Sequence, residues 1–453
     1  MRVPHLKYST KRPEQRDISY FYGLSRQTKT VAGELVEMKN LCSENPGCIT
    51  PRPKRSVYRT LTSGKALFAA ANGKLCWVDG TNFYYDGVSK GSVTASAKYM
   101  ADFFGKILIF PDKKYYDYNT DTFATMGSGT YPADGSVPDM DVIAVFENRV
   151  WGIKGFNVYA SVYNDCLNWT QFSADPNALD DAIHIEITPD KGQIVGLIPL
   201  ENHMLFATSH STYEGYGNAR NYIPQLVSNS RGTLSAKSMC EVDGRVFMLS
   251  RDGVNIYSGS LPRPVSDKLK SGYVSGISGT DGRWYYISLH DGNEHTLYAY
   301  DTRYTSYNNS APSSWYKEDN LHVIDFAYTE GFLYALTASN QILKFNDSSS
   351  EEEITWEAET EEFNNNYLGN VSTYKIKIEA LLSEGSEIDV YLKVSGGEYE
   401  FLDTCYYEKQ SPHNYKIYML PARSESFQVK FAGRGNAQVL SLVREVSVST
   451  DKQ

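Results

Sequence analysis

The sequence predicts an all-β protein: a β-propeller of six or seven blades, followed by a C-terminal β-sandwich and preceded by an extended N-terminal arm. Three observations support this fold class. Tyrosine (35 copies) and glycine (34 copies) are unusually frequent among the 453 residues, a composition typical of strands joined by tight turns. A hairpin-like octet recurs along the chain. The C-terminal part alternates apolar and polar side chains with the period of β-strands.

The recurring octet is clearest at Val242–Leu249, a turn dipeptide and an apolar run that continue into the alternating stretch Ser250–Tyr257. This pattern is typical of a β-hairpin. Seven such octets align on Gly64, Gly105, Asn148, Asn202, Gly244, Gly282 and Gly331. Their spacings of 41, 43, 54, 42, 38 and 49 residues match the length of a four-stranded propeller blade. The alternative is an ordinary β-sandwich whose hairpins recur by chance.

The limits of this repeat divide the chain into three parts. Residues 1–55 are assigned to an N-terminal arm and an extended docking strap, residues 56–347 to the propeller, and residues 348–453 to the sandwich. The polar stretch Ser348–Glu353 has the composition of a hinge between the last two parts. The beginning of the arm is basic and weakly patterned, so it is either a segment that orders against a neighbouring subunit or a surface loop.

The docking strap contains three cations close to two prolines. Pro51 and Pro53 flank Arg52, and Lys54 and Arg55 follow. Proline holds the backbone extended, so we expect the cationic groups to project. Arg52, Lys54 and Arg55 are therefore candidates for a subunit interface with carboxylates of a partner, although a basic connector into the first blade explains them equally well.

Motifs for catalysis, cofactors or metals are weak. The stretch Gly87–Gly91 matches the nucleophile-elbow pattern, but it lies between hairpins and lacks the following helix that an elbow requires. His203 and His210 flank a strand and are not spaced as helical zinc ligands. The strands that we expect to lie innermost are apolar: Leu67–Ala69, Ile107–Ile109 and Val246–Met248. We therefore predict no enzyme, no catalytic residue, no cofactor and no metal site.

The charge and the cysteines narrow the choice of partners and compartment. A formal net charge of −10 argues against wrapping DNA by phosphate neutralisation and suits a conduit along which DNA slides. The six cysteines are dispersed without a Cys-x-x-Cys pair, which favours free thiols made in a reducing cytosol. No run of 18 apolar residues and no signal-peptide core occur, so we expect no membrane contact.

Taken together, these parts resemble the packaged-DNA stabilisation, tail hub or nozzle proteins of tailed bacteriophages, over almost the whole chain. The stretches that carry the resemblance are Glu37–Leu41 with Ile49–Arg55, Asn148–Gly152 with Val158–Ser161, Ser250–Val254, Ile354–Glu357 and Lys430–Gly435. One departure from the pattern is the scarcity of glycine around the Asn202 repeat, which leaves the blade number at six or seven.

The resemblance implies a structural protein of the virion tail. Six copies would form a ring below the portal and connector, with the propeller outward and the other parts lining the channel for double-stranded DNA. The ring would help to retain the packaged genome and would offer a platform for tail fibres. The alternative is a carbohydrate-binding or carbohydrate-degrading tail propeller, in which the many tyrosines stack on sugar rings.

Overall fold

The computed structural model describes residues 14–28, 30–173, 175, 180–187, 192–217, 222–304, 312–347, 351–363, 371–409 and 411–448. The chain forms two units. The first consists of Met1–Arg52, Ser310–Glu318 and Glu352–Gln453, and the second of Pro53–Asn309 and Asp319–Glu351. The second unit is therefore inserted in the chain of the first, and Ser310–Glu318 of the first unit divides it into two segments.

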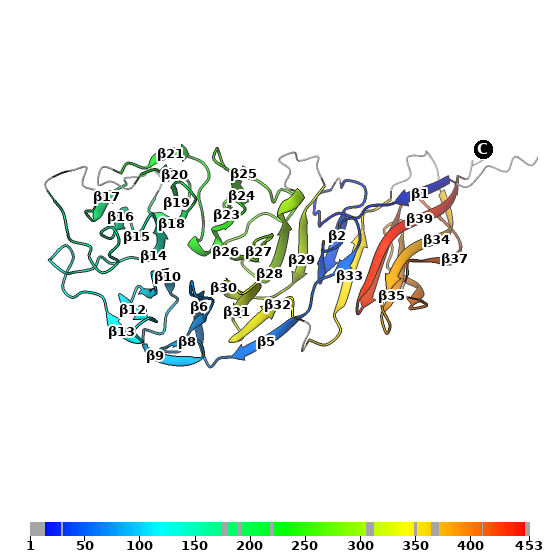
Figure 1. The fold of residues 1–453 in the computed structure, drawn as a ribbon. Helices are drawn as coiled ribbons and strands as arrows, with labels where there is room; N and C mark the ends of the chain where they lie inside the picture. Colours follow the sequence, from blue (N-terminus) through cyan, green and yellow to red (C-terminus); the bar gives the residue numbers. More distant parts are fainter. Residues whose placement is uncertain are drawn as a thin grey trace, which may run out of the picture. The chain divides into compact units, whose positions relative to one another are not determined.

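Seven four-stranded antiparallel sheets form a β-propeller, which confirms the predicted fold class (Figure 1). The first three sheets contain β6 (Gly64–Ala69), β7 (Leu75–Asp79), β8 (Asn82–Tyr85) and β9 (Val88–Ser92); β10 (Tyr99–Phe103), β11 (Lys106–Phe110), β12 (Lys114–Asp117) and β13 (Thr122–Thr125); and β14 (Val142–Phe146), β15 (Arg149–Lys154), β16 (Asn157–Ala160) and β17 (Ile183–Glu186). The fourth and fifth contain β18 (Ile194–Pro199), β19 (Met204–Thr208), β20 (Thr212–Gly215) and β21 (Gln225–Ser228); and β22 (Cys240–Val242), β23 (Arg245–Ser250), β24 (Gly253–Tyr257) and β25 (Arg263–Pro264). The sixth and seventh contain β26 (Ser275–Thr280), β27 (Trp284–His290), β28 (His295–Asp301) and β29 (Trp315–Asp319); and β30 (Val323–Thr329), β31 (Phe332–Thr337), β32 (Gln341–Phe345) and β5 (Arg55–Thr60). Two short 3-10 helices, η1 (Ala236–Ser238) and η2 (Thr302–Tyr304), lie between strands.

The ring closes because the strand that begins the propeller segment completes the last sheet. β5 pairs with β32, with Arg55 opposite Phe345 and Val57 opposite Leu343. A core shared by the seventh and first sheets seals this junction, with Leu336 packed in the same cluster as Trp77. Both sides of each blade are thus covered by a neighbour, which hides most strand edges.

The same stacking explains why the octets carry apolar runs. The second strands β11, β19 and β23 are buried over consecutive residues, because each is covered on both faces by the adjacent blades. The outer strands β9 and β13 have mainly exposed or half-buried residues. A continuous apolar run therefore marks the second strand of a blade, and a polar strand marks its outer edge.

One octet was aligned wrongly in the sequence. Six of the seven alignment positions, from Gly105 to Gly331, lie in turns between the first and second strands. Gly64 instead begins the innermost strand β6, and the corresponding turn of the first sheet contains Gly73, which has a φ of +86°. The octet beginning at Thr62 fits the repeat pattern only because β6 also combines a glycine with apolar residues. The seven sheets of the structure place the blade count at the upper of the two predicted values.

The other unit contains two antiparallel sheets, as the alternation near the C-terminus predicts. One has the order β1 (Glu14–Ile18), β39 (Ala437–Val448), β34 (Val371–Leu382) and β37 (His413–Ser424). The second has the order β2 (Leu35–Lys39), β33 (Thr355–Thr360), β38 (Phe427–Arg434), β35 (Glu387–Val394) and β36 (Glu400–Tyr406). A short pair, β3 (Leu41–Cys42) and β4 (Thr50–Pro51), completes the unit. Arg444 of β39 lies over the ring of Phe427 of β38 at 5.0 Å, so the two sheets pack face to face.

The prediction of a separate N-terminal arm over residues 1–55 is wrong for the described part. β1 pairs with β39 and β2 pairs with β33, so the N-terminal segment supplies an edge strand to each sheet of the sandwich. The sandwich is consequently built from both ends of the chain. Residues 1–13 of the predicted arm and residues 348–350 of the predicted hinge lie outside the described residues. Among the helices of the described ranges, none has the length and apolar character needed to cross a membrane.

Candidate functional site

Arg52 and Arg55 are buried by contacts with their own chain, so the prediction that they project towards a partner is wrong. Arg52 is 7% exposed, and its Nε donates a hydrogen bond to Oδ1 of Asn40 at 2.9 Å. Nη1 of Arg55 lies 2.7 Å from Oδ2 of Asp319, and its guanidinium lies 4.4 Å from the ring centre of Phe345. The prolines do not decide where the side chains point, because carboxylate, amide and aromatic partners within the chain hold them.

Lys54 is half-buried, and its surroundings show the structural role of this stretch. The carbonyl of Lys54 accepts a hydrogen bond from the backbone N–H of Asp347 at 3.0 Å. The Ser56 hydroxyl donates to Asp347 at 2.7 Å, and the backbone N–H of Arg55 donates to Glu351 at 2.6 Å. These residues tie the beginning of the propeller segment to its end, and we call residues 54–56, Asp347 and Glu351 the neck.

The axis of the propeller is crossed by a charged contact, whereas the sequence predicted apolar inner strands. Nζ of Lys237, in η1 before the fifth sheet, lies 2.8 Å from Oδ2 of Asp325 in the seventh sheet. The same oxygen accepts a hydrogen bond from the backbone N–H of Leu67 in the first sheet. The ammonium also lies 5.5 Å from the ring centre of Tyr99 in the second sheet, and burial together with nearby Asp325 raises the pKa of Tyr99. Contacts between sheets that are not neighbours must span the axis.

The apolar strands chosen as innermost, such as Ile107–Ile109 and Val246–Met248, belong to β11 and β23. They are second strands, buried between blades. The innermost strands of these two blades, β10 and β22, each contain an acidic residue, Asp102 and Glu241. The prediction is therefore wrong for these two stretches, whereas Leu67–Ala69, which we also expect to lie innermost, does belong to the innermost strand β6.

The turns between first and second strands all lie at one end of the propeller, because each blade runs outward from the axis in the same order. In four of these turns both central residues have positive φ: Phe104 and Gly105, Glu147 and Asn148, Asp243 and Gly244, and Glu330 and Gly331. Such turns favour Asn, Asp and Gly. Phe104 is the exception, since the other three turns have an acidic residue in its place.

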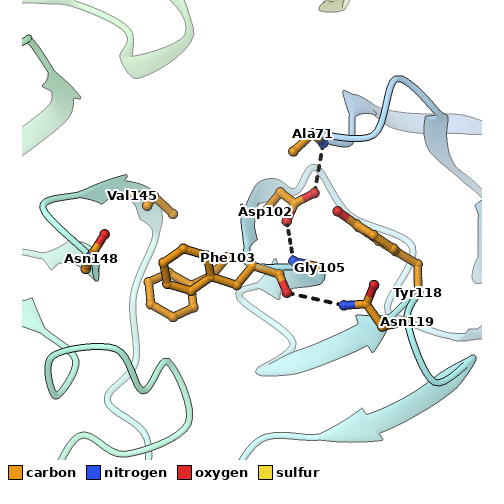
Figure 2. A pocket seen from close by; sticks show the side chains of 9 residues that line it. Ala71, Asp102, Phe103, Gly105, Tyr118, Asn119, Val145 and Asn148 are labelled. Carbon is orange, nitrogen blue, oxygen red and sulfur yellow. Dashed lines mark hydrogen bonds between the residues drawn. The ribbon is translucent and has the colours of Figure 1, made fainter.

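An open pocket of about 540 Å³ lies at this end, and we take it as the candidate functional site (Figure 2). Its lining comes from the first three sheets: Ala71, Asp102, Phe103, Phe104, Gly105, Tyr118, Asn119, Val145 and Asn148. Phe104 is 65% exposed whereas Phe103 is 4% exposed, and the two rings meet edge to face with centres 4.6 Å apart. The buried ring therefore supports the exposed one.

Asp102 fixes the polar side of this pocket. Its carboxylate accepts a hydrogen bond from the backbone N–H of Ala71 at 2.8 Å and another from Gly105 at 3.0 Å (Figure 2). Burial and the carboxylate of Asp102 raise the pKa of Tyr118 to about 12, so this phenol is a hydrogen-bonding group at neutral pH. The Asn119 amide donates to the carbonyl of Phe104 at 3.3 Å. Asp102 thus joins two turns and acts as scaffold for the pocket.

Histidines take part in two further clusters of the propeller. His203 Nε2 lies 2.9 Å from the hydroxyl of Tyr257, which in turn hydrogen-bonds to Glu214. Burial raises the pKa of Tyr257 and lowers that of His203, which favours a neutral hydrogen-bonded link between the fourth and fifth sheets. His210, at the other end of strand β19, has its Nδ1 2.8 Å from the hydroxyl of Ser209.

The second cluster is a stack of three imidazole rings. The ring centre of His295 lies 4.3 Å from that of His290 and 3.4 Å from that of His322, each with an interplanar angle of 9°. Parallel rings direct their nitrogens outward rather than towards one ion. Within the described ranges, no group of three or more His, Cys, Asp or Glu side chains is arranged to hold a metal.

The remaining sequence motifs have structural places. Val88–Ser92 of the elbow-like pattern is strand β9, joined to β8 by a turn at Gly87, so a strand follows where an elbow needs a helix. All six cysteines are free thiols. Phe104 was missed in the sequence, although the aligned turns held the signal: an aromatic residue where other blades have Glu or Asp.

Fold and site define an all-β protein with a seven-sheet propeller inserted into a sandwich. No protein-family model and no curated protein matches the chain. Similar solved structures include BamB from Moraxella catarrhalis, 9% identical with a TM-score of 0.40 over 64% of this chain and 84% of that one. The computationally designed Ika8 protein is 11% identical with a TM-score of 0.41 (72% and 99% covered). The AfRom2 CNH domain is 8% identical with a TM-score of 0.41 (65% and 100% covered). These are similarities of fold, and they assign no activity to the chain.

Proposed function

We propose that the chain is a structural protein of a bacteriophage tail, a hub or nozzle subunit that forms a hexameric ring. The ring would extend the DNA channel below the portal or connector, help to retain the packaged genome and offer a platform for fibres. The observation that carries this proposal is the insertion of a self-closed propeller into a sandwich built from both ends of the chain. This arrangement suits a tail component in which one part assembles and another is presented.

The neck supports the insertion as a physical unit. Arg55 and Ser56 at the beginning of the propeller segment hydrogen-bond to Glu351 and Asp347 at its end. These contacts join the two ends of the propeller segment to each other, and β5 is the strand that closes the ring of sheets. A contact between subunits that lies outside the propeller segment therefore does not disturb the blades.

The sandwich retains the features of a surface that can pair with a neighbour. β36 and β37 each form one edge of the two sheets, at the side opposite β2 and β1, and β37 is 12 residues long. Phe401 and Tyr406 on β36 are 56% and 61% exposed, and Tyr418 on β37 is 74% exposed. A long edge strand with exposed aromatic side chains is a template for pairing with another chain. We place the subunit contact of the ring here, in place of Arg52 and Arg55.

In this proposal DNA passes through the centre of the ring of subunits. The contact of Lys237 with Asp325 spans the propeller axis, which leaves that axis unsuited to a duplex. The formal charge of −10 fits a lumen along which DNA slides with weak repulsion.

Negative-stain images and light scattering of the purified protein, alone and mixed with a connector protein, test the proposal. We expect hexameric rings in at least one of the two conditions. Monomers in both conditions would contradict it.

The competing function is a tail propeller that degrades carbohydrate instead of serving as a structural ring. Incubation of the protein with host capsule separates a degrading enzyme from a structural ring. We expect no release of reducing sugar, and release that persists after repurification would favour the enzyme.

A further inference from the structure

We propose that the pocket at the first-to-second-strand turns of the first three sheets binds a neutral saccharide, with Phe104 as the stacking platform. This site is independent of the ring proposal, because it uses residues of the propeller alone and needs no second subunit. Ring formation and saccharide binding can therefore fail separately.

The first argument is the conformation of Phe104. It has a φ of +51° in a turn where Glu147, Asp243 and Glu330 have φ values of +46°, +54° and +51° in the corresponding turns. A bulky residue is disfavoured in this region, and formation of the turn does not need one, since three other blades form it with a carboxylate. Backbone strain of this kind is concentrated at functional sites, so the strained Phe104 indicates a binding role.

The second argument is that neighbouring residues hold the aromatic side chain of Phe104 in place. Phe104 is 65% exposed, yet Phe103 beneath it is 4% exposed and contacts it edge to face. The carbonyl of Phe104 is also held by the Asn119 amide. An exposed aromatic ring that is fixed on one side presents a flat apolar surface at little further entropic cost on binding.

The third argument is the chemistry around the ring. Asn119 and Asn148 are exposed amides at the pocket, and Tyr118 and Asp102 add a hydroxyl and a carboxylate. A pyranose presents C–H groups on one face and hydroxyls around its edge, so it matches an aromatic surface bordered by amides. The nine lining residues include one acid and neither lysine, arginine nor histidine, which disfavours phosphate and acidic sugars and points to a neutral ligand.

Saturation-transfer-difference NMR of the full chain with millimolar maltose, cellobiose, lactose and mannobiose tests the site. We expect saturation transfer to ring C–H protons of at least one sugar. The Phe104→Glu variant should weaken its binding at least tenfold. This variant installs the kind of residue that Glu147 and Glu330 provide in the same conformation, so it should fold at least as well as the parent, with an unchanged circular dichroism spectrum.

Phe401→Ala is the matched control, because it removes another exposed aromatic ring from a different unit, and it should bind the sugar as the parent does. Asn119→Ala should weaken binding severalfold without abolishing stacking. The proposal is overturned if the parent binds none of the four sugars, if Phe104→Glu binds as well as the parent, or if an apolar peptide such as acetyl-Leu-Pro-Tyr-amide saturates the site and excludes the sugar.

Discussion

The propeller and the sandwich are both antiparallel β-structures, but they treat their strand edges in opposite ways. Strands of the seven propeller sheets are at most seven residues long, whereas β34, β37 and β39 of the sandwich each have 12 residues. The propeller closes its ring with β5, while the sandwich keeps β36 and β37 at its edges with exposed aromatic side chains. The difference indicates that the sandwich edges, more than the closed ring of propeller sheets, are able to accept a neighbour.

If the two units have separate cores, removing one large buried side chain from each should affect different unfolding transitions. Trp77 is 1% exposed and stacks under Arg59 of β5 at the ring closure, and Trp356 is 0% exposed in the sandwich. We expect Trp77→Ala and Trp356→Ala each to cost about 4 kcal/mol of unfolding free energy. Differential scanning calorimetry should show a lowered propeller transition for the first and a lowered sandwich transition for the second. A single transition lowered by both variants would show that the two units unfold together, contrary to the comparison.

The charged pairs of the two units should differ by several fold in their contribution to stability. Lys98 and Asp112 in the propeller are 2.5 Å apart with side chains 0% and 3% exposed. Lys430 and Glu357 in the sandwich are 2.6 Å apart but 24% and 44% exposed. We expect Asp112→Ala to cost about 3 kcal/mol, since it leaves a buried ammonium, and Glu357→Ala to cost less than about 1 kcal/mol.

Urea denaturation measures both variants, and the double variant Lys98→Met, Asp112→Leu is the control. It should recover most of the loss, because an apolar pair of similar size needs no charge compensation. Equal losses for Asp112→Ala and Glu357→Ala would show that burial does not distinguish the two units.

The histidine stack gives the propeller a pH dependence. Burial, followed by the charges of His322 and His290, lowers the pKa of His295 from 6.5 to about 4, although Asp291 opposes this shift. The unfolded chain therefore binds more protons between about pH 6.5 and 4, so this contribution to stability is present at neutral pH and is lost as the pH falls through that window. Partial exposure limits the loss to about 1 kcal/mol.

Thermal unfolding of the parent and of His295→Gln at several pH values checks this expectation. The variant should be less sensitive than the parent between pH 6.5 and 4, and the sandwich transition should be unaffected. His184 and His203, whose pKa values are also lowered by burial, remain in both proteins and cancel in the difference. Identical pH profiles would show that the histidine stack does not contribute to the pH dependence of stability.

The sequence predicted the class of each unit because their signals are local. Turn dipeptides and apolar runs identify second strands, and strict alternation identifies sandwich strands such as Glu387–Val394, whose burial pattern alternates over its first six residues. The pairing of β1 with β39, which joins Glu14 to Val446, was not predictable in this way. Such pairing depends on partners more than 400 residues away, and a short polar strand has the composition of an arm.

The candidate site was harder to predict than the fold for a similar reason. Arg52 and Arg55 are cations near prolines in the sequence, but Asn40 and the distant Asp319 decide their burial. Lys237 and Asp325 meet across the axis only because the ring closes. Phe104 was the one site residue within reach of sequence reasoning, since an aligned comparison of the turns isolates it.

The most direct measurement is the oligomeric state of the full chain and of one matched pair of variants, by mass photometry with and without a connector protein. Tyr418→Glu charges the exposed edge of β37, and its 74% exposure predicts almost no change in unfolding free energy. We expect rings for the parent and for Phe104→Glu, and monomers for Tyr418→Glu. A parent that stays monomeric in both conditions, or rings that persist in Tyr418→Glu, would contradict the assignment of assembly to the sandwich edge.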